Sequence, residues 1–198
     1  LHMDVFKQRL EQEYDLSIII TAPSVLYKVQ LKYSDEIIDI ENPSDFPDPV
    51  KIETISEPYI DATILMPKEY LGVVIKLCQE KRGEQTHLEY LDENRIILKY
   101  KLPLNDIAID FYDQLKSLTS GYGSLDYEEA GYQPAKLVKM DILLNGKPVD
   151  ALSIIVHEDN AYYIGKDLCE RLRKVIPRQL FEVIIQAAIG ASELPTFL

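Results

Sequence analysis

Few side chains in this sequence have the type and spacing that catalysis requires. The three histidines, His2, His87 and His157, are scattered and isolated. Each could act as a general base, but a histidine without a partnered nucleophile is more often structural. Glu128 and Glu129 are adjacent carboxylates, and neighbouring strand positions point to opposite faces of a sheet. They therefore do not form an acid–base dyad, and solvated charge is the better interpretation.

Nucleotide and metal motifs are also missing from the sequence. There is no GxxxxGK[ST] phosphate-binding loop, so the chain is not expected to hold a nucleotide in the P-loop manner. Cys78 and Cys169 lie far apart in helix-like apolar patterns, which favours buried free thiols over a disulfide or metal ligands. We therefore predict a binding protein without catalytic residues or a bound cofactor.

Composition limits the kind of partner. The 198 residues are 46% hydrophobic and 27% charged, with a formal net charge of −12, and no apolar run is long enough to span a membrane. A net acidic chain repels nucleic acid on average. Any RNA contact must therefore be local, through exposed backbone, aromatic rings or small basic patches, unless basic segments lie outside this chain.

Three regions could provide such local contacts. The turn at 81–85 carries Lys81 and Arg82, and the loop at 118–124 combines backbone donors, hydroxyls and Tyr122. A plain helix cap, with Gly121 in the left-handed conformation, is the alternative for this loop. The third region is a late helix with a basic face, which acidic residues dilute.

A basic stripe along one strand has two open interpretations. Arg95, Lys99 and Lys101 alternate, so their side chains share one face of the strand. They form either a binding stripe or an ordinary exposed face paired with Glu89 and Glu93.

The elements that must position these residues follow from periodicity. Within 57–134 we predict a strand at 59–66, a helix at 68–81, a hairpin of 85–91 and 95–102 around the turn 92–94, a helix at 107–118 and a strand at 122–132. The order β-α-β-β-α-β predicts an α+β fold, the split βαβ, ferredoxin-like sandwich.

The flanking segments are expected to form smaller units. Before the sandwich we predict a helix at 1–14, strands at 16–21 and 25–32, and an acidic, proline-rich linker at 34–56. After it we predict a hairpin of 138–144 and 149–156 around Asn145-Gly146, a helix at 161–176, a strand at 180–188 and a tail at 191–198.

A series of short sequence motifs, in the same order along the chain, gives it a family resemblance. It resembles the LepA (elongation factor 4) family of translational GTPases in words found along residues 1–190, among them ITAPSV at 20–25, PKEYLG at 67–72, LKSLTSGY at 115–122, VDALS at 149–153 and IPRQ at 176–179. The words after residue 136 separate LepA from elongation factor G, which lacks the last domain.

The resemblance implies a domain order. Residues 1–33 correspond to the remnant of a third domain like that of elongation factor G, and 34–56 to a linker. Residues 57–134 correspond to that factor's ferredoxin-like fifth domain, and 135–190 to the start of the LepA-specific α+β C-terminal domain. Residues 191–198 (ASELPTFL) depart from the family's basic continuation, and the GTPase domain is not in this sequence.

The resemblance also implies a function. Proteins of this family hydrolyse GTP with Mg²⁺, bind the ribosome, and are proposed to promote back-translocation and fidelity under stress. Their partners would be ribosomal RNA, proteins near the GTPase-associated centre, and tRNA, and they occur in the cytoplasm and partly at the inner face of the membrane. This chain is expected to bind as a monomer, without GTPase activity. A ligand-sensing ferredoxin-like module is the alternative, since fold alone does not fix function.

Carried over to this sequence, the resemblance turns the three regions into candidate ribosome contacts. They are Lys81, Arg82, Gly83, Gln85, Ser120, Gly121, Tyr122, Ser124, Lys166, Arg173, Lys174 and Arg178.

Overall fold

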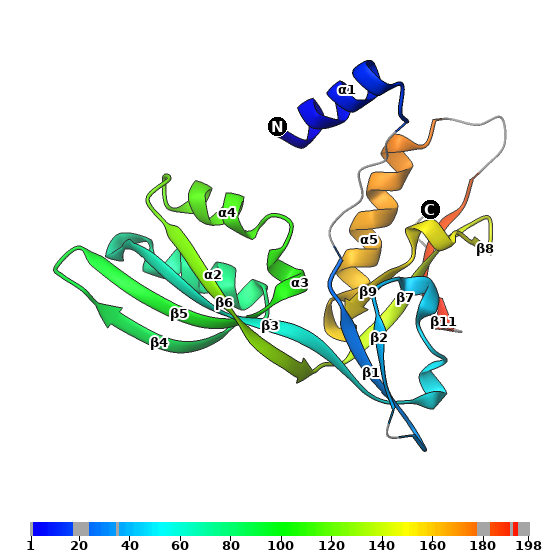
Figure 1. Cartoon of the computed structure of the whole chain (residues 1–198), viewed down its shortest axis with the longest axis horizontal. Coiled ribbons are helices and arrows are strands. Elements are labelled where there is room, and N and C mark those ends of the chain that lie inside the picture. The colour runs from blue at the N-terminus through cyan, green and yellow to red at the C-terminus, as the bar shows by residue number, and fades with distance from the viewer. Residues whose placement is uncertain (1, 18–23, 35, 178–182, 191, 194–198) are drawn as a thin grey trace.

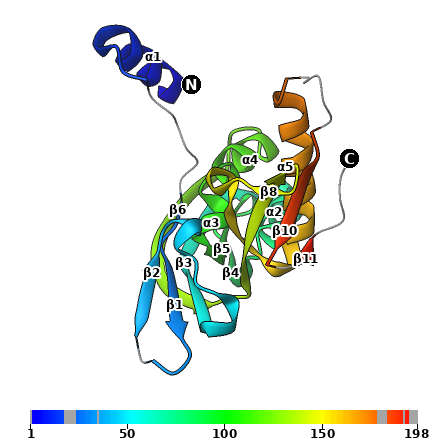
Figure 2. The same ribbon diagram turned by 90° about the vertical axis from the view of Figure 1, so that its right-hand side faces the viewer.

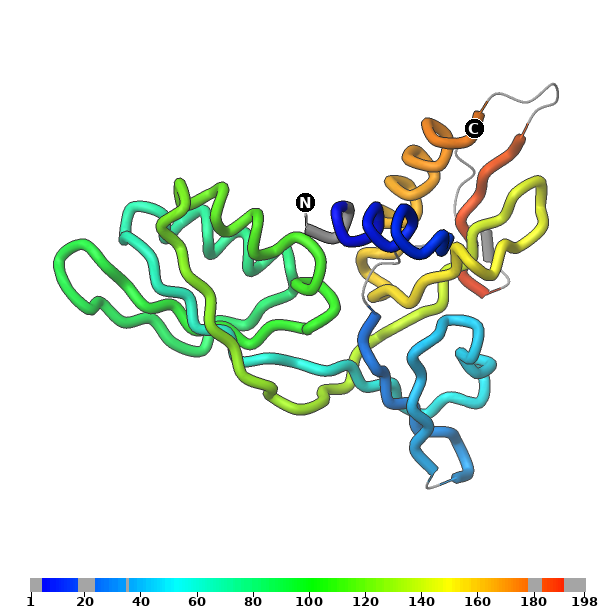
Figure 3. Tube along the Cα trace, turned by 45° about the horizontal axis from the view of Figure 1, so that its top comes forward, coloured from blue at the N-terminus to red at the C-terminus, as the bar shows by residue number. Residues whose placement is uncertain are grey.

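The computed structural model describes residues 2–17, 24–34, 36–177, 183–190 and 192–193. Two lobes are joined by the long strand β3 (Ile52–Pro67), which runs from one into the other with β6 (Ser124–Pro134) beside it (Figures 1 and 3). No helix in the described ranges is long and apolar enough to cross a membrane.

The first lobe is the predicted sandwich. Its elements are β3, α2 (Leu71–Glu80), β4 (Glu84–Tyr90), β5 (Arg95–Pro103), α3 (Leu104–Ile107), α4 (Phe111–Leu118) and β6. The strands pair antiparallel in the order β6-β3-β5-β4, so β5 separates β3 from β4 as the split βαβ arrangement requires. The ferredoxin-like prediction is confirmed.

Alternation along the strands explains the core of this lobe. Ile60, Ala62, Ile64 and Met66 are buried along one face of β3, as period-two alternation dictates. The helices α2 and α4 lie on that same face (Figure 1). The opposite face of the sheet is more exposed and mixes polar side chains, such as Asp61 and Lys99, with the half-buried Leu65 and Ile97.

The predicted helix at 107–118 is wrong in its continuity. The structure has α3 and α4 in its place, with a break at residues 108–110. Asp110 leaves the helical region with φ −133° and ψ −5° at the start of α4, and Ile109 is 68% exposed. The Asp110 carboxylate accepts hydrogen bonds from Lys81 and Gln114, and these bonds stabilise the break.

The second lobe combines segments from both ends of the chain. Strands β1 (Tyr27–Leu31) and β2 (Ile37–Ile40) extend the first sheet along β3. The second sheet contains β7 (Leu137–Leu144), β8 (Lys147–Pro148), β9 (Ile154–His157), β10 (Ile185–Ile189) and β11 (Ser192–Glu193). The helix α5 (Glu158–Val175) covers one face of this sheet (Figure 2).

The expected linker at 34–56 is largely regular structure. It contains β2, two single 3-10 turns at Pro43–Asp45 and Pro49–Lys51, and the first residues of β3. Ile40 is buried and Phe46 packs on a core cluster that includes Leu137 and Ile155 of the second sheet. The apolar residues outweighed the prolines, because Pro43 and Pro49 each begin a 3-10 turn and Pro47 lies between these turns, outside the strands. The domain limits themselves remain predictions.

Around Asn145-Gly146 the hairpin forms, but the predicted strand 149–156 is broken. Both turn residues have positive φ, 52° and 75°, as this tight turn requires. The returning chain pairs as β8, leaves the sheet in a 3-10 turn at Asp150–Leu152, and pairs again as β9. The buried Ser153 donates a hydrogen bond to Asp141 Oδ1 at 2.7 Å, which satisfies its hydroxyl at the break.

The remaining predictions lie partly outside the described residues. Helix α1 (His2–Tyr14) confirms the helix predicted at 1–14. Of the strand predicted at 16–21, residues 16–17 have no regular structure and the others are not described. The strand predicted at 180–188 is β10 from residue 185, and residues 180–182 are not described. The expected tail begins with β11, which pairs with β10.

Candidate functional site

Eleven of the twelve candidate residues are among the described residues, and they lie in three separate places. Residues 120–124 form the loop from α4 into β6, at the end of α4 that points away from the second lobe (Figure 1), and we call this loop the distal tip. Residues 81–85 are at the opposite end of α2, beside the second lobe. Lys166, Arg173 and Lys174 lie on α5, and Arg178 lies outside the described residues.

The backbone of the distal tip is a helix-terminating motif. Ser120 and Gly121 follow α4 with φ of 51° and 86°. The Gly121 N–H donates to the carbonyl of Lys116 at 2.7 Å, the six-to-one bond of a Schellman motif. The left-handed residue right after the cap is thus Ser120, and Gly121 comes next. This loop is a helix cap, and its exposed surface stays available for binding.

A buried threonine fixes this loop. The Thr119 hydroxyl donates to the Leu115 carbonyl at 2.7 Å and accepts from the Gly123 N–H at 2.8 Å, and the residue is fully buried. A Cβ at Gly123 would lie 2.7 Å from the Thr119 hydroxyl oxygen. The turn that presents Tyr122 is therefore rigid.

Aromatic and polar side chains surround the fixed loop. Tyr122 is 71% and Tyr112 51% exposed, and the Lys116 ammonium lies 5.5 Å from the Tyr112 ring centroid. The Tyr70 hydroxyl donates to Ser120 Oγ at 3.3 Å. Exposed rings suit base stacking, and an ammonium beside hydroxyls suits phosphate oxygens. Ser124 only begins β6, with its hydroxyl 3.5 Å from the Leu65 carbonyl.

The turn at the end of α2 has the same backbone motif but a different surface. Arg82 has φ 56°, and the Gly83 N–H donates to the Cys78 carbonyl at 2.8 Å. A Cβ at Gly83 would lie 2.6 Å from Leu102 Cδ2 and 2.8 Å from the Cys78 carbonyl oxygen. Glycine is required here by packing.

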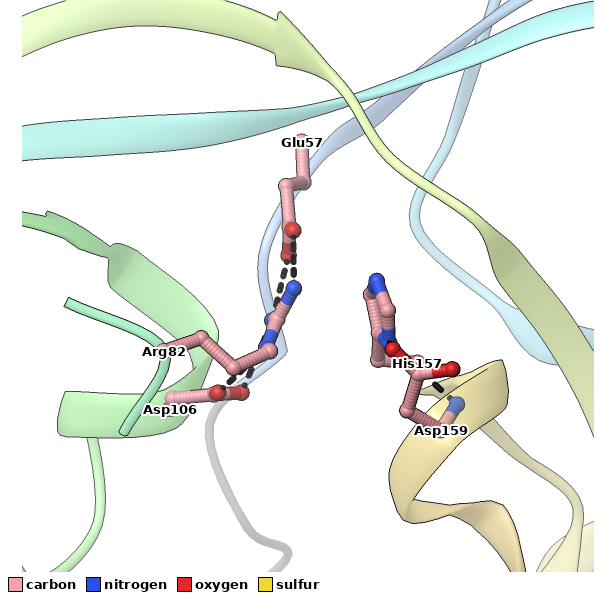
Figure 4. Close-up of polar contacts among 5 residues, drawn as sticks. All are labelled: Glu57, Arg82, Asp106, His157 and Asp159. Carbon is pink, nitrogen blue, oxygen red and sulfur yellow. Dashed lines mark hydrogen bonds and ion pairs between the residues drawn. The ribbon is translucent and has the colours of Figure 1, made fainter. Parts of the chain in front are cut away.

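The charged side chains of this turn are bound within the chain. Lys81 pairs with Asp110 at 2.9 Å. Arg82 makes two bonds to Glu57, of 2.6 and 3.0 Å, and two to Asp106, of 2.8 and 3.1 Å (Figure 4). We call the junction between the two lobes the waist, and Glu57, Arg82 and Asp106 the waist triad. Gln85 is exposed and accepts a 3.4 Å hydrogen bond from the Tyr100 hydroxyl.

Burial and charge together set the electrostatics of the waist triad. Burial lowers the pKa of Arg82, but its hydrogen bonds to Glu57 and Asp106 outweigh this, and the net pKa is raised. Burial also raises the pKa of Tyr27 nearby, and the charges of Glu57 and Asp106 raise it further. Arg82 is thus permanently charged, and its donors serve its own chain.

Glu57 and Asp106 were not among the predicted site residues. Glu57 lies on β3 with the same inward orientation as Ile55, and only 1% of it is exposed. A carboxylate at a core-facing strand position signals a buried partner, and this was the available clue. Glu57 and Arg82 lie far apart in the sequence, so the sequence does not show that Arg82 is this partner.

The basic face of α5 is exposed but not free of partners. Lys174 is exposed, and Lys166 and Arg173 are exposed but make further interactions. Tyr162 and Tyr163 contact each other edge to face, with centroids 5.5 Å apart. His157 is the N-cap of α5, and its Nδ1 accepts a hydrogen bond from the Asp159 N–H at 3.3 Å.

The strand register favours the ordinary interpretation of the basic stripe on β5. Lys101 lies opposite Glu84 on one side and Asp61 on the other. Glu89 lies opposite Ile97, so the partner acids differ from those expected. Cross-strand neutralisation therefore leaves little free positive charge near Lys101.

The described part of the chain contains no cluster of three His, Cys, Asp or Glu residues that could hold a metal ion. The two carboxylates of the waist triad are both bound to Arg82. Neither fits Mg²⁺.

Two family models cover consecutive parts of the chain. Residues 54–143 match the elongation factor G C-terminus, and residues 144–194 match the C-terminus of the GTP-binding protein LepA. The chain belongs to the LepA (elongation factor 4) family. The boundary between the two matches falls inside β7, so the LepA match begins in the sheet of the second lobe.

Curated relatives agree with this assignment. Elongation factor 4 of Streptococcus pneumoniae, from strain Hungary19A-6 and from serotype 2 strain D39 / NCTC 7466, is 57% identical over 190 residues. These residues are 96% of this chain but only 31% of each relative's length. A crystal structure from Thermus thermophilus is 26% identical over 41% of this chain and 12% of the other, with a TM-score of 0.39. This chain therefore spans about a third of the length of the elongation factor 4 relatives that it matches.

Proposed function

We propose that this chain is the ribosome-binding part of its translation factor and that the distal tip contacts ribosomal RNA. The observation that carries the proposal is the rigid loop after α4, which exposes Tyr122 and Ser120. Lys116 of α4 donates a hydrogen bond to the Gly121 carbonyl of this loop at 3.2 Å and lies over the exposed ring of Tyr112. A chain with a net charge of −12 needs such a local contact, because its overall field repels phosphate.

The activity of the whole protein belongs to the proposal as well. We propose GTP hydrolysis with Mg²⁺ by residues outside this chain, which spans 31% of its curated relatives. The sequence has no GxxxxGK[ST] phosphate-binding loop, so GTP turnover by this chain is not expected. Promotion of back-translocation and of fidelity under stress is the role proposed for the whole protein.

The proposed partners are those that the family resemblance implies, assigned here to the two lobes. The distal tip would meet RNA and proteins near the GTPase-associated centre, and α5 with its exposed Lys174 would face tRNA. The protein would act as a monomer in the cytoplasm, with a peripheral fraction at the inner face of the membrane.

Tyr122→Ala tests the distal tip. Loss of one stacked base costs roughly 1–3 kcal/mol, so the affinity for ribosomes should fall at least about fivefold. Tyr33→Ala is the matched control, because Tyr33 is fully exposed in the second lobe. Cosedimentation of the full-length protein with ribosomes provides the measurement. Equal binding by both variants would remove the distal tip from the interface, and no binding by the unmutated protein would defeat the function.

The ligand-sensing alternative has one observation in its favour. A largely apolar cleft of about 630 Å³ lies in the second lobe, between residues 46–55 and the strands β7 and β10. Calorimetry against amino acids and nucleotides tests it, and silence throughout would count against this alternative. The cleft lies outside the ferredoxin-like lobe that motivated it.

A further inference from the structure

We infer that Arg82 is a positioning residue: through Glu57 and Asp106 it fixes the angle between the two lobes, so that surfaces on both can meet one ribosome. The ribosome part rests on the proposed function, whereas the angle does not. The inference replaces the expectation that Arg82 itself contacts RNA.

The waist triad lies where the chain passes from one lobe to the other. Ser56 of β3 pairs with Lys28 of the second lobe, and Tyr59 pairs with Pro103 of the first. Glu57 is between these two pairs, at the point where β3 exchanges one neighbour for another. A bulge against β6 follows directly, between Pro58 and Ile60. Strands bend at bulges, so this point is where the angle between the lobes is set.

Arg82 joins this point to the helical side of the first lobe. Its guanidinium makes one bidentate pair (a fork) with Glu57 of β3 and a second with Asp106 of α3. The four hydrogen bonds are between 2.6 and 3.1 Å long. Two forks hold a planar group in one orientation. The left-handed backbone of Arg82, with φ 56°, and the space that only Gly83 fits aim the side chain at the waist.

Helix α3 extends the connection to both cores. Leu104 packs against the core of the first lobe and also against the cluster formed by β1, β2, Leu137 and Ile155. Asp106 is in the same helical turn, so one short helix carries both an apolar and an ionic contact at the waist. Releasing Asp106 would therefore loosen the contact that Leu104 makes between the lobes.

Removing Arg82 takes away the two hydrogen bonds that the buried Glu57 carboxylate accepts from its guanidinium. Glu57 is 1% exposed, and an unpaired charge there must move towards water. Water is available in the adjacent cleft of about 560 Å³, which Arg82 lines together with Tyr59, Lys136, His157 and Asp159. Figure 4 places His157 and Asp159, from the start of α5, across this cleft from the waist triad. Movement of Glu57 into the cleft would change the spacing of the lobes.

A distance measurement between the lobes tests the inference. Spin labels at Lys76→Cys and Glu170→Cys place one probe on α2 and one on α5, and both positions are exposed. The native Cys78 and Cys169 are buried and stay unlabelled. Double electron–electron resonance on the 198-residue chain gives the distribution of distances. Arg82→Met is the test variant, and Arg82→Lys keeps the charge but loses both forks, in case the first variant does not fold.

A matched control is Arg95→Met. Arg95 pairs with Asp92 at 2.8 Å in the same lobe, but on an exposed turn away from the waist. We expect a broader or shifted distribution for both Arg82 variants and an unchanged one for Arg95→Met. An unchanged distribution in a folded Arg82 variant, with only its melting temperature lowered, would overturn the inference, because a merely local role predicts that result.

Ribosome binding supplies the second readout. If both lobes engage together, a loose waist should weaken binding by roughly 10²-fold, since the second contact loses its effective concentration. Altered distances with full ribosome affinity would overturn the positioning role. If the unmutated protein does not bind ribosomes, the proposed function fails, and the distances still decide whether Arg82 sets the angle.

Discussion

At the scale of single residues, two glycines at the ends of α2 differ in what surrounds them. A Cβ added at Gly72 meets nothing within 4 Å, whereas one added at Gly83 meets Leu102, Cys78 and Tyr100 within 3 Å. Gly72 therefore costs conformational entropy on folding, although the site has room for a side chain. The second allows the chain to turn tightly against the core.

Alanine at these two positions should therefore have opposite effects. Gly72→Ala is expected to stabilise the chain by up to about 1 kcal/mol. Gly83→Ala is expected to destabilise it by about 1–3 kcal/mol, because the methyl group overpacks the site against backbone. Urea unfolding followed by circular dichroism measures both. Equal stability of the two variants would show that the turn yields to the methyl group, contrary to this account.

The sequence signalled Gly83 but not the reason for it. A glycine after a helix predicts a left-handed cap, and here Arg82 takes that conformation while Gly83 provides the space. Likewise Lys81 and Arg82 predicted a basic patch, because a sequence shows charges but not their partners. Both side chains are paired with acids that lie far away in the chain.

At the scale of elements, one hydroxyl determines how the loop after α4 is held. Thr119 bonds to the last turn of α4 and to Gly123 at the same time, without access to water. Thr119→Val keeps the shape but leaves the Gly123 N–H without its partner. An unsatisfied buried donor costs about 1–3 kcal/mol.

Thr119→Val should consequently free the distal tip without unfolding the lobe. We expect faster amide hydrogen exchange at Tyr122 and Gly123 and unchanged exchange in β5, together with weaker ribosome binding. Ser117→Ala is the control, since Ser117 is exposed on the same helix. Exchange at the tip that matches the unmutated protein would mean that the backbone motif alone holds the loop.

Element types were predictable where periodicity was strong, and element limits were not. The alternation in β3 and the glycine turns gave the order of the sandwich. The breaks at Asp110 and Ser153 arise from side-chain bonds to Lys81 and Asp141, partners that periodicity does not show. Strand β2 was missed because three prolines suggested a linker, while the burial of Ile40 decided its structure. The distal tip was predictable as a loop, but its rigidity depends on Thr119.

At the scale of the whole molecule, charge and shape constrain ribosome binding together. The net charge of −12 opposes approach to phosphate, and the described basic side chains at the waist are neutralised internally. Contact must therefore be made by a few presented groups, with aromatic stacking adding affinity that does not depend on charge. Such binding tolerates an acidic chain as long as the lobes hold these groups in place.

Salt dependence distinguishes this mode from ordinary electrostatic binding. Each neutralised phosphate contributes about 0.7–0.9 to the slope of log affinity against log salt, so a few contacts predict a slope shallower than about −4. Lys116→Ala should reduce the slope by one such increment. Tyr122→Ala should lower affinity at every salt concentration and leave the slope unchanged, because stacking releases no counterions. Cosedimentation with ribosomes across a salt series measures the slope for the unmutated protein and for both variants. A slope as steep as that of six to ten phosphate contacts would mean that RNA is bound by a basic surface elsewhere, and the distal tip would lose its role.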